Sequence, residues 1–294
     1  MMHFGQSLID ALSLGALYAL VALGIGLVFG VMRLANFAHG EIITGAAYAL
    51  IFTWHLGPVV SVFVSLLVGV VLAILMELLV FRRLRTTTPA TLLIASFGLS
   101  FLLQRVYEAL FGTNVRTAPV ASGLAGTVTV LGLRLQILSL VTIALTAVLL
   151  LAVHYFLTRT NLGLQVRAAS TDFRTARLLG VRADRVIMLT FGISGGLAAV
   201  VAFVMTVQTG AVGPTFGVPL TVLALVGAVI GGIDRVIGSL VGGFLMGFAS
   251  SFFSSWLPEG IVRFRDAFVF LLVILVLLVK PAGLLAGSGT VERT

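Results

Sequence analysis

Cysteine is absent from this sequence of 294 residues, and charged side chains are scarce. Without cysteine, disulfides, thiolate nucleophiles and thiolate metal sites are excluded. Asp, Glu, Lys and Arg make up 10% of the residues, whereas a soluble domain carries about 25%. Because 60% of the residues are hydrophobic, a soluble fold of this length could not cover its apolar surface with polar groups. The composition therefore indicates a protein that lies in a lipid bilayer.

The sequence instead contains a series of apolar stretches close to the length that a helix needs to span a bilayer. The alternating strands that a membrane barrel requires are not found. We therefore predict an all-α fold, a polytopic transmembrane helical bundle with residues 1–294 in a single domain. It would have eight or nine membrane segments, some of them short or broken, at residues 8–30, 37–54, 59–81, 91–111, 136–157, 187–208, 219–233, 236–256 and 266–279.

Basic residues are concentrated in a few of the connections between these stretches. In a soluble protein the net charge of +8 would suggest nucleic acid binding. Here the orientation of the protein in the membrane explains the positive charge better, because cytoplasmic loops of membrane proteins are rich in Lys and Arg. Residues 82–85 form one short basic connection, and residues 158–186 form a longer one two spans later. Both are predicted to be cytoplasmic, as is the C-terminus, whereas the side of the N-terminus depends on whether residues 37–54 cross or re-enter the membrane.

Two segments are too short or too polar for ordinary spans. One starts at Asn36 and continues to residue 54, and the other runs from Pro214 to residue 233. Broken helices at matching places in two halves of a transporter indicate its binding site. Candidates for lining a solute pathway are Asn36, His39, Glu41, Thr44, Pro214 and Pro219. A second interpretation is compatible with the first: Asn36 caps a helix, and Glu41 lies favourably in its first turn.

Residues 158–186 contain the pattern of a short helix. Thr171 or Asp172 can cap its start, and Gly180 stands where a C-cap glycine is expected. An apolar stripe would consist of Phe173, Ala176 and either Leu178 or Leu179. Such a helix either lies on lipid headgroups or fills a groove on a partner protein, and its composition favours neither.

Three stretches resemble the permeases of branched-chain amino-acid ABC transporters. The run Asn36-Phe37-Ala38-His39-Gly40 is specific to that family. Residues 167–181 look like its cytoplasmic-loop signature, and the glycine-rich run 225–243 is shared with related sugar permeases. These stretches lie in the same order as in the family, and the resemblance covers about residues 8–285.

The resemblance implies a multi-pass permease subunit of an ABC importer in the bacterial inner membrane. It would move branched-chain or other apolar amino acids inward by alternating access. The implied partners are a second permease subunit, identical or homologous, two cytoplasmic ATPase subunits and an extracytoplasmic substrate-binding protein. A coupling loop for the ATPase would include Arg167, Asp172, Phe173, Arg174, Ala176, Arg177, Leu178 and Gly180.

The sequence itself indicates no cofactor, metal site or catalytic residue. The glycines of residues 40–46 lack the Lys and Ser/Thr of a Walker A motif, so ATP would be hydrolysed by partner subunits. No serine, histidine and acid group forms a recognisable triad, so we expect no enzyme. Two alternatives stay open: an ABC permease of the same type that carries urea, short amides or a sugar, and an ATP-independent secondary transporter or channel. Ion pairs are expected between Arg105 and Glu108, and between Glu77 and Arg82 or Arg83.

Overall fold

A computed structural model of the chain describes residues 2–85, 87–130, 133–233, 235–281 and 283–285. Each apolar stretch predicted from the sequence is helical. The corresponding helices are α1 (Met2–Met32), α2 (His39–Thr53), α3 (Pro58–Met76), α5 (Pro89–Phe111), α6 (Ile137–Arg159), α9 (Ala183–Thr209), α10 (Val218–Gly231), α11 (Val236–Trp256) and α12 (Arg265–Val279). The predicted all-α bundle is therefore confirmed.

Six helical stretches in the described part of the chain are long and apolar enough to cross a bilayer: α1, α3 with its extension to Leu84, α5, α6, α9 and α11. The helices α2, α10 and α12 are shorter, with 15, 14 and 15 residues. A helix of 15 residues rises about 22 Å, less than the roughly 30 Å of a bilayer core. The total of eight or nine membrane segments therefore stays a prediction.

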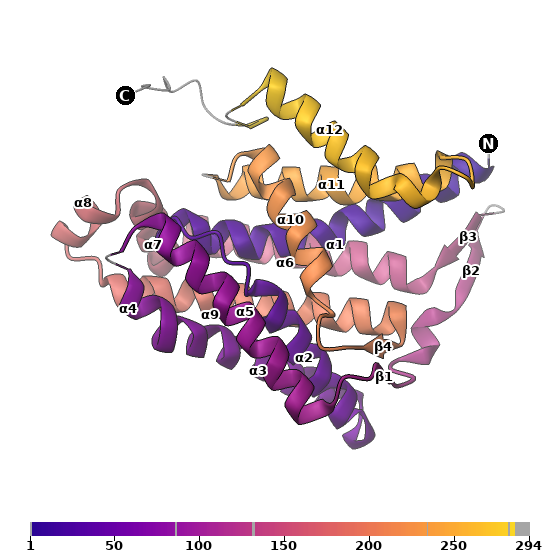
Figure 1. Cartoon of the computed structure of the whole chain (residues 1–294), viewed down its shortest axis with the longest axis horizontal. Helices are drawn as coiled ribbons and strands as arrows, with labels where there is room; N and C mark the ends of the chain where they lie inside the picture. Colours follow the sequence, from indigo (N-terminus) through magenta and orange to yellow (C-terminus); the bar gives the residue numbers. More distant parts are fainter. Residues whose placement is uncertain (1, 86, 131–132, 234, 282, 286–294) are drawn as a thin grey trace.

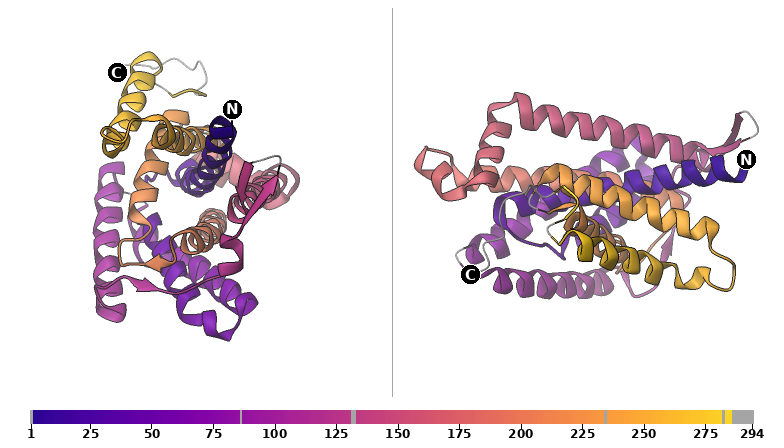
Figure 2. Two further views of the ribbon diagram at one scale, coloured as in Figure 1. Left: turned by 90° about the vertical axis from the view of Figure 1, so that its right-hand side faces the viewer. Right: turned by 90° about the horizontal axis from the view of Figure 1, so that it is seen from above.

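Helix α1 lies in the middle of the bundle, against α11, α9 and α6 (Figures 1 and 2). Glycines let α11 approach it closely, because a Cβ built on Gly247 would stand 2.5 Å from the carbonyl oxygen of Leu14. Helices α3 and α9 meet in the same way, with Gly69 against the backbone of Gly195. Small residues at such crossings permit the close packing that holds helices together in lipid.

Basic segments gather at one end of the bundle, which we call the basic end. It contains α4 (Arg82–Leu84), α7 (Asn161–Thr171) and α8 (Phe173–Leu178), on the left in Figure 1. Residues 158–186, predicted as a loop with one short helix, thus contain two helices and the start of α9. The Thr160 hydroxyl accepts a 2.9 Å hydrogen bond from the Gly163 amide and caps α7. Gly163 also permits the sharp turn after α6, because a Cβ there would collide with the Phe156 carbonyl.

Short strands and 3-10 turns lie between the long helices. Strands β2 (Thr127–Val130) and β3 (Leu133–Gln136) form an antiparallel pair, with Thr127 opposite Gln136. A second antiparallel pair joins β1 (Arg116–Thr117) to β4 (Ala211–Val212), with Arg116 opposite Val212. The sequence analysis predicted none of these strands, which are too short to show an alternating pattern. The 3-10 turns are η1 (Trp54–Leu56), η3 (Ser122–Ala125) and η4 (Val262–Phe264).

Candidate functional site

The short helix α2 begins inside the bundle, next to the polar run that precedes it. The Asn36 side-chain oxygen accepts a 3.0 Å hydrogen bond from the Ala38 amide, and the Asn36 carbonyl accepts one of 3.3 Å from the His39 amide. Asn36 is buried, so both bonds lie away from solvent. The N-cap residue of α2 is Ala38, with no side-chain cap bond, so the predicted capping by Asn36 is wrong, and the Asn36 side chain instead closes the turn before the helix. The adjoining Phe37 ring stacks on Phe97 of α5, with 3.9 Å between the ring centroids.

Glu41, in the first turn of α2, is fully buried against α5. Its Oε1 accepts hydrogen bonds from the Ser100 hydroxyl at 2.8 Å and the Gln104 amide at 2.9 Å. Its backbone carbonyl accepts a 2.7 Å bond from the Tyr107 hydroxyl. The other carboxylate oxygen, Oε2, has no hydrogen-bond partner among the described residues. A buried carboxyl group is costly in a bilayer, and α5 offsets part of that cost with these donors.

The sequence analysis missed these partners on α5, although a signal for them exists. Ser96, Ser100, Gln104 and Tyr107 recur every three or four residues along an otherwise apolar helix. That spacing places them on one helical face. A polar stripe on a membrane helix could therefore have been predicted to face another polar group.

His39 points from α2 toward the long helices rather than toward Glu41's partners. Its Nδ1 lies 3.4 Å from the Ser194 hydroxyl of α9, and its Nε2 has no partner in the described part of the chain. A Cβ built on Gly24 of α1 would stand 3.1 Å from the His39 ring. The missing side chain at Gly24 therefore creates the space that the imidazole fills.

The start of α2 also touches the segment that leads into α10. The Thr44 hydroxyl donates a 3.0 Å hydrogen bond to the Gly40 carbonyl and accepts one of 3.0 Å from the Gly217 amide. A Cβ on Gly40 would stand 2.9 Å from the Gly217 carbonyl oxygen. Pro214 is buried, whereas Pro219, in the first turn of α10, is exposed. The two broken segments that the sequence singled out therefore meet in space.

Three of the predicted pathway residues thus point from the start of α2 toward different helices, and they do not converge on a common cavity. Glu41 faces α5, His39 faces α1 and α9, and Thr44 faces the start of α10. At the crossing itself the backbones of Gly40 and Gly217 are in contact, so no side chain fits between them.

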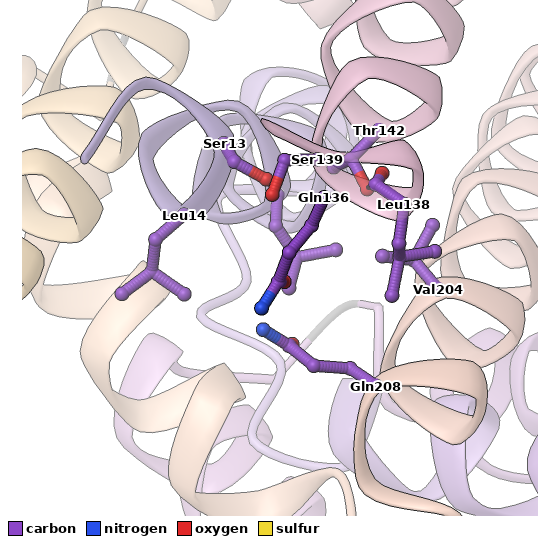
Figure 3. Close-up of a pocket in the computed structure, with 9 residues that line it drawn as sticks. Ser13, Leu14, Gln136, Leu138, Ser139, Thr142, Val204 and Gln208 are labelled. Atoms are coloured by element: carbon purple, nitrogen blue, oxygen red, sulfur yellow. Dashed lines mark hydrogen bonds between the residues drawn. The ribbon is translucent and has the colours of Figure 1, made fainter. Parts of the chain in front are cut away.

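A separate small cavity of about 10 Å³ lies between α1, α6 and α9. Hydroxyl, amide and aliphatic side chains form its wall: Ser13, Leu14, Leu17, Gln136, Leu138, Ser139, Thr142, Val204 and Gln208. Figure 3 shows the amide groups of Gln136 and Gln208 pointing toward each other. This volume is close to the smallest that holds one water molecule. The cavity is therefore too small for an amino acid.

The predicted coupling segment has the caps that the sequence indicated. Asp172 accepts a 3.0 Å hydrogen bond from the Thr175 amide at the start of α8. Gly180 adopts a φ of 89°, and two backbone bonds of 3.1 Å, from Gly180 to Arg177 and from Val181 to Ala176, close the helix. This is the double hydrogen-bond pattern of a Schellman end, which favours glycine.

The apolar residues of α8 are in part buried against the bundle and in part exposed. Ala176 is buried and Phe173 is partly buried, so these two residues attach α8 to the bundle. Leu178 and Leu179 point outward and are 83% and 80% exposed. Arg167 and Arg177 are exposed, and the side chain of Arg174 lies outside the described residues. The structure therefore presents two adjacent leucines at the tip of the basic end.

A chain of ion pairs connects the end of α3 to the start of α9. Glu77 begins the π-helical turn η2 (Glu77–Phe81) and pairs with Arg85, so the predicted pairing with Arg82 or Arg83 is wrong. Arg85 also pairs with Asp184 at 2.5 Å, and Arg82 pairs with Asp184 at 2.8 Å. The wider π turn shifts the register of the residues that follow it, so Arg85 faces Glu77. The predicted pair of Arg105 with Glu108 is confirmed at 2.5 Å.

Comparison with known proteins relates the whole chain to transport permeases. The family described as branched-chain amino acid transport system permease component matches residues 7–278. The chain is 30% identical over 305 residues to the high-affinity branched-chain amino acid transport system permease protein BraD of Pseudomonas aeruginosa, covering 99% of this chain and 98% of BraD. It is 30% identical over 306 residues to the permease protein LivH of Escherichia coli K12, with the same coverage. No solved structure matches the chain at a significant level.

Proposed function

This chain belongs to the family of permease components of branched-chain amino acid transport systems, and we propose that it forms the membrane pathway of an ATP-driven importer for these amino acids. The observation that carries the proposal is the match to permeases such as BraD along 99% of the chain. The long apolar helices place the protein in the bacterial inner membrane as a multi-pass subunit. The basic end faces the cytoplasm under the positive-inside rule.

The solute pathway passes the crossing of α2 with the segment before α10. The candidates on it are Asn36, His39, Glu41, Thr44, Pro214 and Pro219. Closure by the backbone contact of Gly40 with Gly217 supports a gate at this point. When the two segments separate, amide groups at the starts of both helices become available to a carboxylate. The aliphatic neighbour Ile43 suits the side chain of leucine, isoleucine or valine.

Movement of the gate depends on a partner ATPase that docks on the coupling segment around α8. The exposed Leu178 and Leu179 fit an apolar groove, and the flanking arginines fit its acidic rim. The ion pairs from Asp184 to Arg85 and Glu77 connect the start of α9, just after α8, to α3. ATP binding by the partner then shifts the populations of inward- and outward-facing states.

The complete transporter contains a second permease subunit, two ATPase subunits and an external substrate-binding protein. The binding protein supplies most of the specificity, which allows the permease to bind its solute weakly. Weak binding suits a permease, because a tightly held solute would be released slowly.

Reconstituted vesicles test this function directly. With all partner subunits present and ATP on the side of the basic end, we expect uptake of radiolabelled leucine, isoleucine and valine against a gradient. Urea, acetamide and ribose serve as competing solutes. Uptake that continues when the ATPase subunits are omitted would point to a secondary transporter or channel and end the proposal. Preferential uptake of urea, acetamide or ribose would retain the ABC permease and replace its cargo.

A further inference from the structure

Three long helices at the periphery of the bundle are equally exposed but differ in composition. The most apolar windows of α3, α5 and α6 each have 28% of their residues buried. The mean hydropathy is 3.0 for α3 and 2.5 for α6, but only 1.4 for α5. A helix that faces lipid is expected to be apolar on its outer side. Part of the lower value of α5 comes from its inner stripe of Ser96, Ser100 and Gln104, which faces the start of α2, so the difference on the outer face is the ion pair of Arg105 with Glu108.

The outward stripe of α5 consists of Ile94, Gly98, Phe101 and Arg105, spaced three or four residues apart. Phe101 is 61% exposed and the Arg105 side chain is 75% exposed. A Cβ built on Gly98 would meet nothing within 4 Å. A glycine open to the outside, flanked by bulky side chains, forms the notch into which a second membrane helix can pack closely.

The ion pair of Arg105 and Glu108 makes lipid an unfavourable environment for this stripe. Arg105 lies six residues before the end of α5, about 9 Å inside the helix end. Charged side chains within the hydrocarbon region are costly, and they usually face protein or water. The outer faces of α3 and α6 carry instead Leu67 and Leu75, or Val148 and Leu151.

Helix α5 is also weakly attached to its own chain, since its main partner is the short helix α2. Figure 2, left, shows it at the edge of the molecule. Yet this helix holds Glu41 through Ser100 and Gln104, so its position bears directly on the crossing at the start of α2.

We propose that the outward stripe of α5 is the surface on which the second, homologous permease subunit of the transporter packs. This inference rests on the proposed function, which requires such a subunit. In a two-fold or pseudo-two-fold pair, equivalent faces meet. The partner helix then carries a small or notched surface opposite Gly98 and polar groups that pair with Arg105 and Glu108. Helices α3 and α6 face lipid.

The absence of cysteine makes a direct test possible, because any introduced thiol is unique in this chain. Phe101→Cys is labelled with a benzophenone maleimide on the purified chain before assembly with its partners, the assembled transporter is irradiated, and the adduct is identified by mass spectrometry. Leu151→Cys on α6 and Leu67→Cys on α3 are matched controls on exposed apolar positions. We expect Phe101→Cys to capture the second permease subunit and both controls to capture lipid alone.

A second variant tests the charged part of the surface. Arg105→Leu combined with Glu108→Leu should reduce capture from position 101 at least tenfold, although it makes α5 more apolar. Lipid adducts alone at position 101, or capture of the second subunit equally from positions 67 and 151, would overturn the inference. Should Phe101→Cys fail to assemble, Ile94→Cys reports on the same stripe.

ATP-driven uptake by the same preparations separates this inference from the proposed function. Uptake by the Phe101→Cys transporter with lipid adducts alone would refute the α5 interface and leave the importer intact. If the unmodified transporter shows no ATP-driven uptake, the proposed function fails, while capture still reports which face meets the second subunit.

Discussion

Gly40 and Gly217 lie in backbone contact where the first turn of α2 meets the segment leading into α10. A Cβ on Gly40 would stand 2.9 Å from the carbonyl oxygen of Gly217, and a Cβ on Gly217 would collide with the Gly40 carbonyl. Thr44 fastens the same crossing through its 3.0 Å hydrogen bond with the Gly217 amide. Because both obstacles are backbone atoms, no side-chain adjustment can relieve a larger residue at either position.

Replacing Gly217 with alanine should therefore disturb the crossing. We expect the added methyl group to separate α2 from the start of α10 and to cost about 1–3 kcal/mol of stability. ATP-driven uptake should fall at least tenfold, measured in vesicles at equal protein density. Gly196→Ala is the matched control, because its Cβ would meet only side chains at 3.8 Å. If Gly217→Ala transports as well as Gly196→Ala, the crossing does not control the pathway.

Glu41 offers a test of the polar contact between α2 and α5. Glu41→Ala removes the acceptor for Ser100 and Gln104, and leaving these buried donors unpaired costs roughly 1–3 kcal/mol. Glu41→Gln retains an acceptor oxygen and should keep most of the stability. Thermal unfolding in detergent measures both variants. Equal melting temperatures for the alanine and glutamine variants would show that these hydrogen bonds contribute little.

The helices of this protein could be predicted because lipid imposes a length and a composition on each span. Caps were also readable, as Asp172 and Gly180 show, since they depend on neighbours within a few residues. The ion-pair partner of Glu77 could not be predicted, because the π turn that begins at Glu77 changes which arginine faces the carboxylate. The contact of Thr44 with Gly217 spans 173 positions and follows only from tertiary packing. Sequence therefore indicated which segments are unusual, but not that they touch.

Arg85 is predicted to be the cation at the basic end that contributes most to the stability of the folded subunit. Its side chain is 17% exposed and pairs with Glu77, whose side chain is 1% exposed. Arg85→Ala would leave that buried carboxylate unpaired, which costs about 3–5 kcal/mol. Thermal unfolding should show a large loss for Arg85→Ala and almost none for the exposed Arg83→Ala. Adding Glu77→Gln to Arg85→Ala should restore much of the stability, and a double variant no better than the single one would contradict this account.

Variants of the two leucines at the tip of α8 separate an effect on coupling to the ATPase from an effect on folding. Leu178→Ala with Leu179→Ala removes apolar surface that is already exposed, so the melting temperature of the subunit should change little. Docking of an ATPase on this tip predicts a different result for the assembled transporter, since the apolar contact across the interface is lost. Uptake and the stimulation of ATP hydrolysis by the loaded binding protein should both fall at least tenfold. The pair Leu162→Ala with Leu164→Ala, exposed on α7, is the matched control. Full stimulation in the α8 variant, or an equal loss in the α7 variant, would place the ATPase contact elsewhere on the basic end.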